Sequence, residues 1–474
     1  MRGRLVAAGI IAFAVILGSC LAYLAVHPYH WTLDPVDLGV YRSGGLIVRH
    51  VRPWYDPHLA APLYDWPGYQ NLHLKFTYPP FAAVVFAVVS LIPWRALPPL
   101  SVAVNVAALI AALWFTFGGL GYRRGLTRLG VTLLAAAAVF WTEPVIRSLY
   151  LGQVNLVLMA LIIWDLCQPD TRQSGASRWW KGAGVGVAAG IKLVPLIFIP
   201  YLLLTRRFRA AAVACAAFAA TVAAGFVVAP ADSARWWLGG LFFNGGRTGF
   251  VGWEGNQSLR ALLTRLAGSV TGAEPVWLAV ALVTAGAGLA CAALLDRAGH
   301  RLPGLLACAL TGLMISPITW DHHWAWIVPG VAVAAVYAVR ATRAPAAPRW
   351  PAAGYWALAA AMLVVYGAWP GRLWGEPNDL GQFSLGVIWQ PPNTDPEVYY
   401  RYGDQPWFAE YHWHGIELLT GNAFLLGGLA LLAILIAAAI RTRLPGRSPT
   451  PTSPSTPATP SNPTHPAPSA RTSS

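Results

Sequence analysis

A succession of apolar segments, each about as long as a lipid bilayer is thick, constrains this chain more than any other feature. The first runs from Leu5 to Val26, and others follow between short arginine-rich stretches. A helix needs about 20 apolar residues to cross a bilayer. Hydrophobic residues make up 56% of the 474 residues and charged residues only 11%, whereas soluble domains carry roughly 25%. The chain is therefore predicted to be an all-α polytopic protein of the plasma membrane.

Arginine clusters set the expected orientation, because cytoplasmic loops are enriched in Arg and Lys. With Arg2 and Arg4 inside, we predict about 11–12 transmembrane helices in one domain at residues 1–446, with juxtamembrane helices on the periplasmic face. The apolar stretch after Pro80 is predicted to be re-entrant or surface-lying, since every arginine cluster then falls inside. Residues 182–204 have basic flanks at both ends, which predicts a hairpin of two half-helices that turns near Lys192 to Pro195.

Three periplasmic loops are expected, at residues 27–99, 229–273 and 370–421. Among the 19 acidic residues, only Asp165, Asp170 and Asp296 then fall on the cytoplasmic side, so the polar chemistry is expected outside. Residues 447–474 are rich in Pro, Ser and Thr, which predicts a disordered cytoplasmic tail. A signal peptide, or a lipoprotein site ending at Cys20, is an alternative for the first segment. A retained helix is favoured because more spans follow.

Several classes of function are disfavoured. The net charge of +14 comes from arginines between apolar runs, so nucleic acid is not an expected partner. The five cysteines lie in or beside apolar runs without a CxxC pair, so they are interpreted as small buried residues. The chain has no P-loop, GxSxG, HExxH, usable Rossmann fingerprint or DxD pair, and we expect no metal or other cofactor. A transporter needs ionisable groups within several spans, and only Lys192 qualifies.

Two carboxylates follow the first apolar segment, in the stretch WTLDPVDLGVYRSGG that begins at Trp31. Asp34 precedes Pro35, a pattern typical of a helix N-cap with proline at the first helical position. Asp37 is expected to project from the first turn of that helix, near the membrane surface. A carboxylate there can reach a hydroxyl of a substrate held at the interface, so Asp37 is the candidate general base.

Lys192 lies within an apolar run, where a cation without a partner costs about 2.5 kcal/mol or more. A snorkelling lysine is one interpretation, and a ligand for a lipid phosphate is the favoured one. Asp321, His322 and His323 are consecutive between Trp320 and Trp324. Adjacent histidines on a helix point about 100° apart and do not chelate as an i,i+4 pair does. Hydrogen bonding to a phosphate or a sugar hydroxyl is preferred over a metal site or an interfacial aromatic belt.

Further polar residues cluster where the chain is expected to reach the outer membrane edge. Arg147 suits a phosphate, and Gln153 and Asn155 suit sugar hydroxyls, although all three could simply close a turn between two spans. Asn256 and Gln257 in the motif GNQS are similar in character. The segment 370–420 interleaves aromatic residues with acids, which fits sugar stacking, a folded cap, or both. His412 and His414 are a weaker candidate for metal binding.

Together these motifs resemble the glycosyltransferase family 87 membrane mannosyltransferases of actinobacteria, which have the GT-C fold. The resemblance is carried, in the family's order, by DLGVY (37–41), TYPPF (77–81), LGQVN (151–155), GIKLVP (190–195), GNQS (255–258) and SPITWDHHW (316–324). The chain looks most like the polyprenyl-phosphate-mannose-dependent α-(1→2)-mannosyltransferases that extend phosphatidylinositol mannosides and lipomannan.

The resemblance implies an inverting enzyme whose active site faces the periplasm. Asp37 would deprotonate the acceptor hydroxyl of a glycolipid mannoside, and a polyprenyl-phosphate-β-mannose donor would lie in the outer leaflet. Another lipid-linked sugar, such as arabinose, and a lipid or glycolipid transporter are the alternatives. The donor phosphate would be held by Lys192, His322 and Arg147. The expected substrate-binding residues are Tyr41, Tyr78, Gln153, Asn155, Asn256, Gln257, Trp320 and His323.

Overall fold

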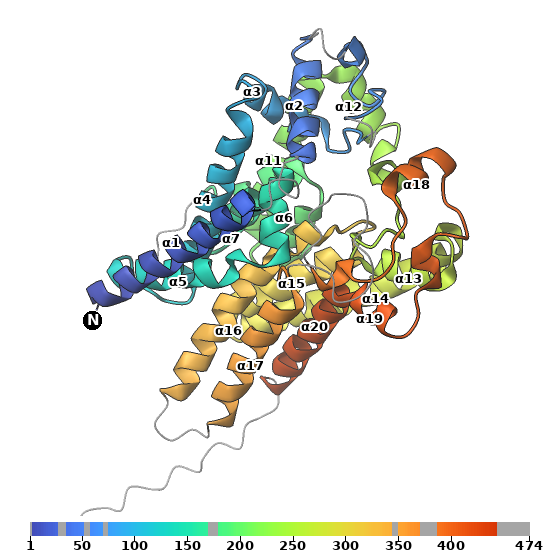
Figure 1. Cartoon of the computed structure of the whole chain (residues 1–474). Helices are drawn as coiled ribbons and strands as arrows, with labels where there is room; N and C mark the ends of the chain where they lie inside the picture. Colours follow the sequence, from blue (N-terminus) through green and yellow to red (C-terminus); the bar gives the residue numbers. More distant parts are fainter. Residues whose placement is uncertain are drawn as a thin grey trace, which may run out of the picture.

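The computed structural model describes residues 2–26, 35–51, 57–69, 74–168, 179–343, 349–369 and 386–442. Within these ranges the chain is all-helical, with only isolated β-bridges between loops, which confirms the predicted fold class. Helices α2, α3 and α12 lie at one end of the molecule, and α16, α17 and α20 extend toward the opposite end (Figure 1). Asp34, the segment 370–385 and the tail 447–474 lie outside the described residues.

The helices of the first half are α1 (Arg2–Val26), α2 (Val36–Val48), α3 (Pro80–Val89), α4 (Leu97–Gly119), α5 (Leu126–Phe140), α6 (Glu143–Leu151), α7 (Asn155–Leu166), α9 (Ala183–Ile191), α10 (Phe198–Leu204) and α11 (Phe208–Val228). Those of the second half are α12 (Pro230–Trp237), α13 (Leu259–Ala267), α14 (Val270–Arg297), α15 (Arg301–Ile315), α16 (Ile327–Thr342), α17 (Trp350–Val365), α18 (Pro396–Tyr402), α19 (Ile416–Thr420) and α20 (Ala423–Arg441). Short 3₁₀ turns are η2 (Pro57–Ala60), η3 (Val194–Ile197), η4 (Leu241–Phe243), η5 (Gly245–Thr248), η6 (Asp321–Trp326), η7 (Val387–Trp389) and η8 (Ala409–His412).

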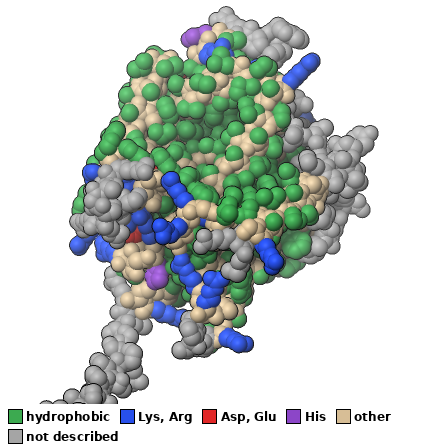
Figure 2. All heavy atoms as spheres, turned by 90° about the vertical axis from the view of Figure 1, so that its left-hand side faces the viewer, with side chains coloured by type: hydrophobic (Ala, Val, Ile, Leu, Met, Phe, Trp, Pro, Cys, Tyr) green, Lys and Arg blue, Asp and Glu red, His purple; other side chains and the backbone are tan. Residues whose placement is uncertain are grey.

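Several of these helices have the length and composition of membrane spans. The described residues contain five such helices, or up to six if α6 and α7, bent by 117°, count as one broken span. Their outward faces stay apolar, as at Leu282 and Val283 of α14, which are 66% and 72% exposed. Figure 2 shows a broad apolar surface of this kind. Such a surface is stable in lipid and not in water, so the chain is a multi-pass membrane protein.

The shorter apolar helices bear on the predicted number of spans. Helices α3, α5, α15 and α17 are apolar helices of 10–17 residues, and α3, at 10 residues, is too short to cross a bilayer alone. This length agrees with the prediction that the stretch after Pro80 does not span. The expected 11–12 spans are reached only if other short helices also cross, so that number stays a prediction.

Basic side chains, Lys and Arg together, gather below the apolar surface in Figure 2, and arginines also bind the ends of several helices. Arg297 of α14 donates to the carbonyl oxygen of Leu204 at 2.6 Å, and Arg301 and Arg340 bind other helix-terminal carbonyls. The last carbonyls of a helix have no partner within it, so these arginines stabilise the ends they contact. Arg207 and Asp296 form an ion pair of 2.9 Å in the same region. Helix ends predicted to be cytoplasmic therefore lie together.

The predicted hairpin at residues 182–204 agrees with the packing of α9 against α11. A Cβ on Gly182 would lie 2.0 Å from the Ala210 carbonyl oxygen, and one on Gly190 would lie 2.2 Å from Thr221 Oγ1. These two contacts mean that α9 and α11 run in the same direction. The chain between them must reverse, and it does so after Lys192, whose backbone is extended at φ −148° and ψ 126°.

A buried arginine holds together the loops at the end of the bundle opposite the arginine clusters. Arg265 of α13 donates to the carbonyl oxygens of Gly252, Trp253 and Asn256 and to the side chain of Asn422. Nearby, the backbone N–H of Thr394 donates to Glu410 at 3.1 Å, and the Glu410 side chain is fully buried. These contacts join the loop before α13, the segment after η7 and the start of α20 into one cap.

The packing of α2 against α3 generates the first prediction. Gly45 of α2 leaves no room for a side chain, because a Cβ there would lie 2.2 Å from the Phe86 carbonyl oxygen, whereas Gly286 of α14 has nothing within 4 Å. Gly45→Ala is expected to destabilise the protein by about 1–3 kcal/mol through overpacking, and Gly286→Ala is not. Thermal unfolding of the purified protein in detergent measures both, and equal melting temperatures would contradict the packing.

The buried carboxyl of Glu410 generates a pH prediction. Burial raises its pKa to about 7 from the ordinary 4.5, so the folded state holds this proton more tightly than the unfolded state. Stability is therefore lost as the pH rises from about 4.5 to 7, and the loss persists above that. Glu410→Gln, which removes the charge, is expected to stabilise the protein by about 2–3 kcal/mol more at pH 8 than at pH 5. Unfolding curves at the two pH values test this, and a pH-independent difference would contradict it.

Candidate active site

A sharp bend between α6 and α7 places two of the predicted polar side chains. Pro144 opens α6, and Gly152 ends it in the left-handed conformation at φ +71°, which glycine adopts without strain. A turn between two spans was one of the two expectations for residues 143–155, and the first nine of these residues form a fully buried helix. Gln153 and Asn155 lie on either side of the point where the chain turns into α7.

Asp37 lies in the first turn of α2, as predicted, and it is held by Gln153. The Gln153 amide donates from Nε2 to Asp37 Oδ2 at 2.7 Å, while its Oε1 accepts from the Tyr41 hydroxyl at 2.8 Å. The Tyr41 and Tyr78 hydroxyls are 3.1 Å apart. Burial raises the pKa of both phenols, so they remain protonated. One hydrogen-bonded chain therefore links Asp37, Gln153, Tyr41 and Tyr78.

Lys192, at the break after α9, joins a second group of predicted residues. Its Nζ donates to Asn155 Oδ1 at 2.9 Å and lies 2.7 Å from His323 Nε2. It also lies 5.8 Å from the centre of the Tyr78 ring, within the range of a cation–π contact. Tyr78 therefore touches both groups, and residues from five separate motifs meet here.

Arg147 and Asp321 form a buried ion pair that connects α6 to η6. Arg147 Nε lies 2.9 Å from Asp321 Oδ2, and the two side chains are only 4% and 3% exposed. Asp321 Oδ1 is 3.0 Å from His322 Nδ1. Arg147 is thus ion-paired with Asp321, and its Nε also lies 3.9 Å from Glu143 Oε1. These contacts are those of a positioning residue. Its predicted role as a phosphate ligand stays a prediction.

Asn256 and Gln257 have the contacts of a scaffold. Asn256 accepts from the backbone N–H of Thr319 at 2.9 Å and donates to the Val251 carbonyl oxygen at 2.9 Å. Gln257 donates to the carbonyl oxygens of Glu254 and Gly421. Both side chains are fully buried and neither lines the two cavities described below. The GNQS motif thus fixes the SPITW turn, and the predicted substrate contacts of these two residues stay predictions.

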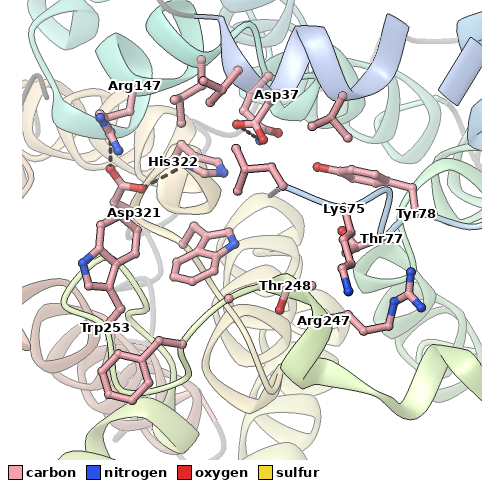
Figure 3. Close-up of a pocket in the computed structure, with 18 of the residues that line it drawn as sticks. Asp37, Lys75, Thr77, Tyr78, Arg147, Arg247, Thr248, Trp253, Asp321 and His322 are labelled. Carbon is pink, nitrogen blue, oxygen red and sulfur yellow. Dashed lines mark hydrogen bonds and ion pairs between the residues drawn. The ribbon is translucent and has the colours of Figure 1, made fainter. Parts of the chain in front are cut away.

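Two adjacent cavities open among these groups. The first, drawn in Figure 3, is lined by Asp37, Gln153, Arg147, Asp321 and His322, with Tyr150, Trp253 and Tyr399 among its aromatic walls. The second is lined by Lys192 and His323 and is otherwise largely apolar, with Leu193, Trp236, Leu241 and Phe242. Both are lined by Thr77, Tyr78, Arg247, Thr248 and Trp320, which form the wall between them. We call the first the polar cavity and the second the apolar cavity.

The structure adds two cations that the sequence analysis missed. Arg247 lines both cavities, and its guanidinium donates to the Tyr64 carbonyl oxygen at 3.0 Å while its Nε is buried without a partner among the described residues. Lys75 is exposed at the polar cavity and points toward its interior in Figure 3. Arg247 and Lys75 each belong to a predicted periplasmic loop, where basic residues are disfavoured. That location was the available signal.

The described residues give no support to a metal site at His322 and His323 or at His412 and His414. Within the described residues, no group of three or more His, Cys, Asp or Glu side chains is arranged to hold a metal ion. The His322 and His323 rings are nearly perpendicular, at 88°, with centroids 4.7 Å apart, which fits the expectation that adjacent histidines diverge. His414 contacts Glu417 at 3.4 Å on the surface. Metal independence stays a prediction.

Comparisons with known proteins bear on what this arrangement does. The family model described as glycosyltransferase family 87 matches residues 76–317. A polyprenol-phosphate-mannose-dependent alpha-(1-2)-phosphatidylinositol pentamannoside mannosyltransferase of Mycobacterium tuberculosis is 36% identical over 68% of this chain and 70% of the relative. The protein of the same description from Mycolicibacterium smegmatis is 35% identical over 83% and 85%.

A second kind of relative acts on a differently described acceptor. It is a polyprenol-phosphate-mannose-dependent alpha-(1-2)-phosphatidylinositol mannoside mannosyltransferase of Mycobacterium tuberculosis, 32% identical over 67% of this chain and 74% of its own length. No solved structure matches the chain. The family match begins after Asp37 and ends before Trp320, so the roles of these residues rest on the geometry.

Proposed function

The chain belongs to glycosyltransferase family 87, and we propose that it transfers mannose from a polyprenyl-phosphate-mannose donor to a phosphatidylinositol mannoside, forming an α-(1→2) linkage. The relatives named above carry donor, acceptor and linkage in their descriptions. The observation that carries the proposal is the pairing of a polar cavity containing Asp37 with an apolar cavity containing Lys192, across one shared wall.

The two cavities suit the two substrates. A polyprenyl phosphate combines a long apolar chain with an anionic head, and the apolar cavity combines Trp236, Leu241 and Phe242 with the cation of Lys192. A mannoside presents hydroxyls and C–H faces, and the polar cavity offers hydrogen-bonding side chains between aromatic rings. The sugar of the donor would then lie at the wall, within reach of the acceptor on the other side.

The proposed reaction is a single displacement with inversion at the mannose C1. Asp37 takes the proton from the acceptor hydroxyl, whose oxygen forms a new bond to C1 on the face opposite the phosphate. The C1–O bond to phosphate breaks, and its electron pair leaves with the phosphate. Gln153, bonded to Asp37 Oδ2 at 2.7 Å, orients the carboxylate. Lys192 stabilises the charge of the leaving phosphate.

The arrangement of charges supports a periplasmic site. The arginine-rich helix ends, at Arg207, Arg297, Arg301 and Arg340, gather at one end of the bundle. Cytoplasmic ends are the arginine-rich ones, and the wall residues Tyr78 and Trp320 belong to the loops predicted to lie on the other side. A donor in the outer leaflet would reach the apolar cavity from there.

Replacing the proposed base tests the assignment directly. Asp37→Asn keeps the shape and the contact to Gln153 but removes the proton acceptor, so mannosyl transfer is expected to fall by about 10²–10⁴-fold. Asp65→Asn is the matched control, because Asp65 is a surface carboxylate bound to Arg235 that lines neither cavity. Transfer from polyprenyl-phosphate-mannose to phosphatidylinositol mannosides in membranes is measured by mass spectrometry. Full activity of Asp37→Asn would refute its role, and activity only with another lipid-linked sugar would refute the donor.

Replacing Lys192 tests the proposed phosphate site. Lys192→Met keeps the length of the side chain and removes the charge, so KM for the polyprenyl-phosphate-mannose donor is expected to rise at least about tenfold, from the loss of one charge-assisted contact. Lys181→Met is the control, since Lys181 is another buried lysine, bonded to the Gln168 carbonyl oxygen and distant from both cavities. An unchanged donor KM in the Lys192 variant would contradict the assignment.

A further inference from the structure

The consecutive histidines His322 and His323 lie on different cavities. His322 lines the polar cavity together with Asp37, and His323 lines the apolar cavity together with Lys192. Their perpendicular rings follow from their adjacent positions at the start of η6. In each ring, Nδ1 is bonded to a partner that can only accept or only donate. In a neutral imidazole that bond determines whether Nε2 is an acceptor or a donor.

His322 is bonded through Nδ1 to a carboxylate. Asp321 is ion-paired with Arg147, so its oxygens only accept, and the 3.0 Å contact requires Nδ1 to carry a proton. In the neutral ring Nε2 is then an acceptor. Nε2 is buried and has no hydrogen-bond partner within the described residues, although an unpaired buried polar atom costs about 1–3 kcal/mol. An acceptor on this cavity wall matches a hydroxyl and mismatches a phosphate, whose oxygens also accept.

His323 has the opposite arrangement. The backbone N–H of Trp320 donates to His323 Nδ1 at 3.2 Å, as the N-cap amide does in a capping box. In the neutral ring the proton is therefore on Nε2, which lies 2.7 Å from Lys192 Nζ. Two nitrogens that can both donate thus converge on one space, and an anionic oxygen is the group that accepts from both.

We propose that the two histidines serve the two substrates separately: His322 accepts a hydrogen bond from a hydroxyl of the acceptor sugar, and His323 donates to the phosphate of the lipid-linked donor. This inference rests on the proposed function and replaces the expectation that His322 binds the phosphate. Asp321 and the Trp320 amide act as positioning groups that set the two tautomers. Neither histidine holds the proton that Asp37 removes.

The kinetic test uses matched ring substitutions in the purified full-length protein. His322→Phe is expected to raise KM for the phosphatidylinositol mannoside about tenfold or more and to leave KM for polyprenyl-phosphate-mannose unchanged, and His323→Phe is expected to do the reverse. His300→Phe is the control, because His300 bonds to Tyr337 at the arginine-rich end. A rise in donor KM for His322→Phe, or the same response from both variants, would overturn the proposal.

A binding test separates this inference from the proposed function. Polyprenyl phosphate alone is expected to raise the melting temperature of the wild type and of His322→Phe, but not of His323→Phe. Loss of that shift in His322→Phe would overturn the division between the histidines. If the wild type bound polyprenyl phosphate but transferred no mannose, the proposed function would fail while the assignment of His323 stood.

The pH dependence has opposite signs under the two possible roles of His322. The charged and titratable groups around it are Asp37 of α2, Glu143 and Arg147 of α6, Lys192 after α9, and Asp321 and His323 of η6. An acceptor Nε2 is lost on protonation, so kcat/KM for the mannoside falls as the pH is lowered. In His322→Gln, whose side-chain oxygen accepts at every pH, this part of the fall is expected to be lost. If instead kcat/KM fell as the pH was raised, and His322→Gln restored it, His322 would be a protonated donor to the phosphate.

Discussion

The buried ion pair between Arg147 and Asp321 is the contact on which the rest of the site depends. It joins α6 to η6 at 2.9 Å with both side chains almost inaccessible, and removing one partner of such a pair costs about 3–5 kcal/mol. Gln153 and Asn155 follow directly after α6, and His322 and His323 follow directly after Asp321. One electrostatic contact therefore sets where the ligand-facing groups of both cavities stand.

Tyr78 lines both cavities and connects their polar groups. Its hydroxyl is 3.1 Å from that of Tyr41, in the network of Asp37, while its ring lies 5.8 Å from Lys192 Nζ. In the proposed reaction, Tyr78 would therefore lie beside the sugar as it moves from the phosphate near Lys192 to the hydroxyl near Asp37. In the proposed mechanism, the apolar lining of Trp236, Leu241 and Phe242 would lower the local dielectric and so strengthen the field of Lys192 on the leaving phosphate.

How far the sequence predicted this structure depends on whether the signal was local. The apolar spans and the break at Lys192 could be predicted because hydropathy and charge are local properties of the sequence. The position of Asp37 in the first turn of α2 could be predicted from the helix-start pattern Asp34-Pro35. The fully buried helix α6 did not follow, because Glu143 and Arg147 look like part of a polar turn until Asp321, 174 residues after Arg147, supplies the partner of Arg147. For the same reason the sequence does not show that Asn256 and Gln257 bond to the backbone of Thr319 and Gly421.

Two potential donors, Lys192 Nζ and His323 Nε2, lie side by side in the apolar cavity. Lys192 Nζ has Asn155 Oδ1 as an acceptor at 2.9 Å, and the neighbouring His323 Nε2 at 2.7 Å holds a proton when the Trp320 amide binds Nδ1. An ammonium in apolar surroundings is expensive without acceptors, and a second donor beside it raises that cost. A phosphate oxygen that approaches both nitrogens from the cavity can accept from each and neutralise the charge. The binding of a lipid phosphate therefore offsets the cost of burying both donors, and the loss of these contacts opposes the release of the product phosphate.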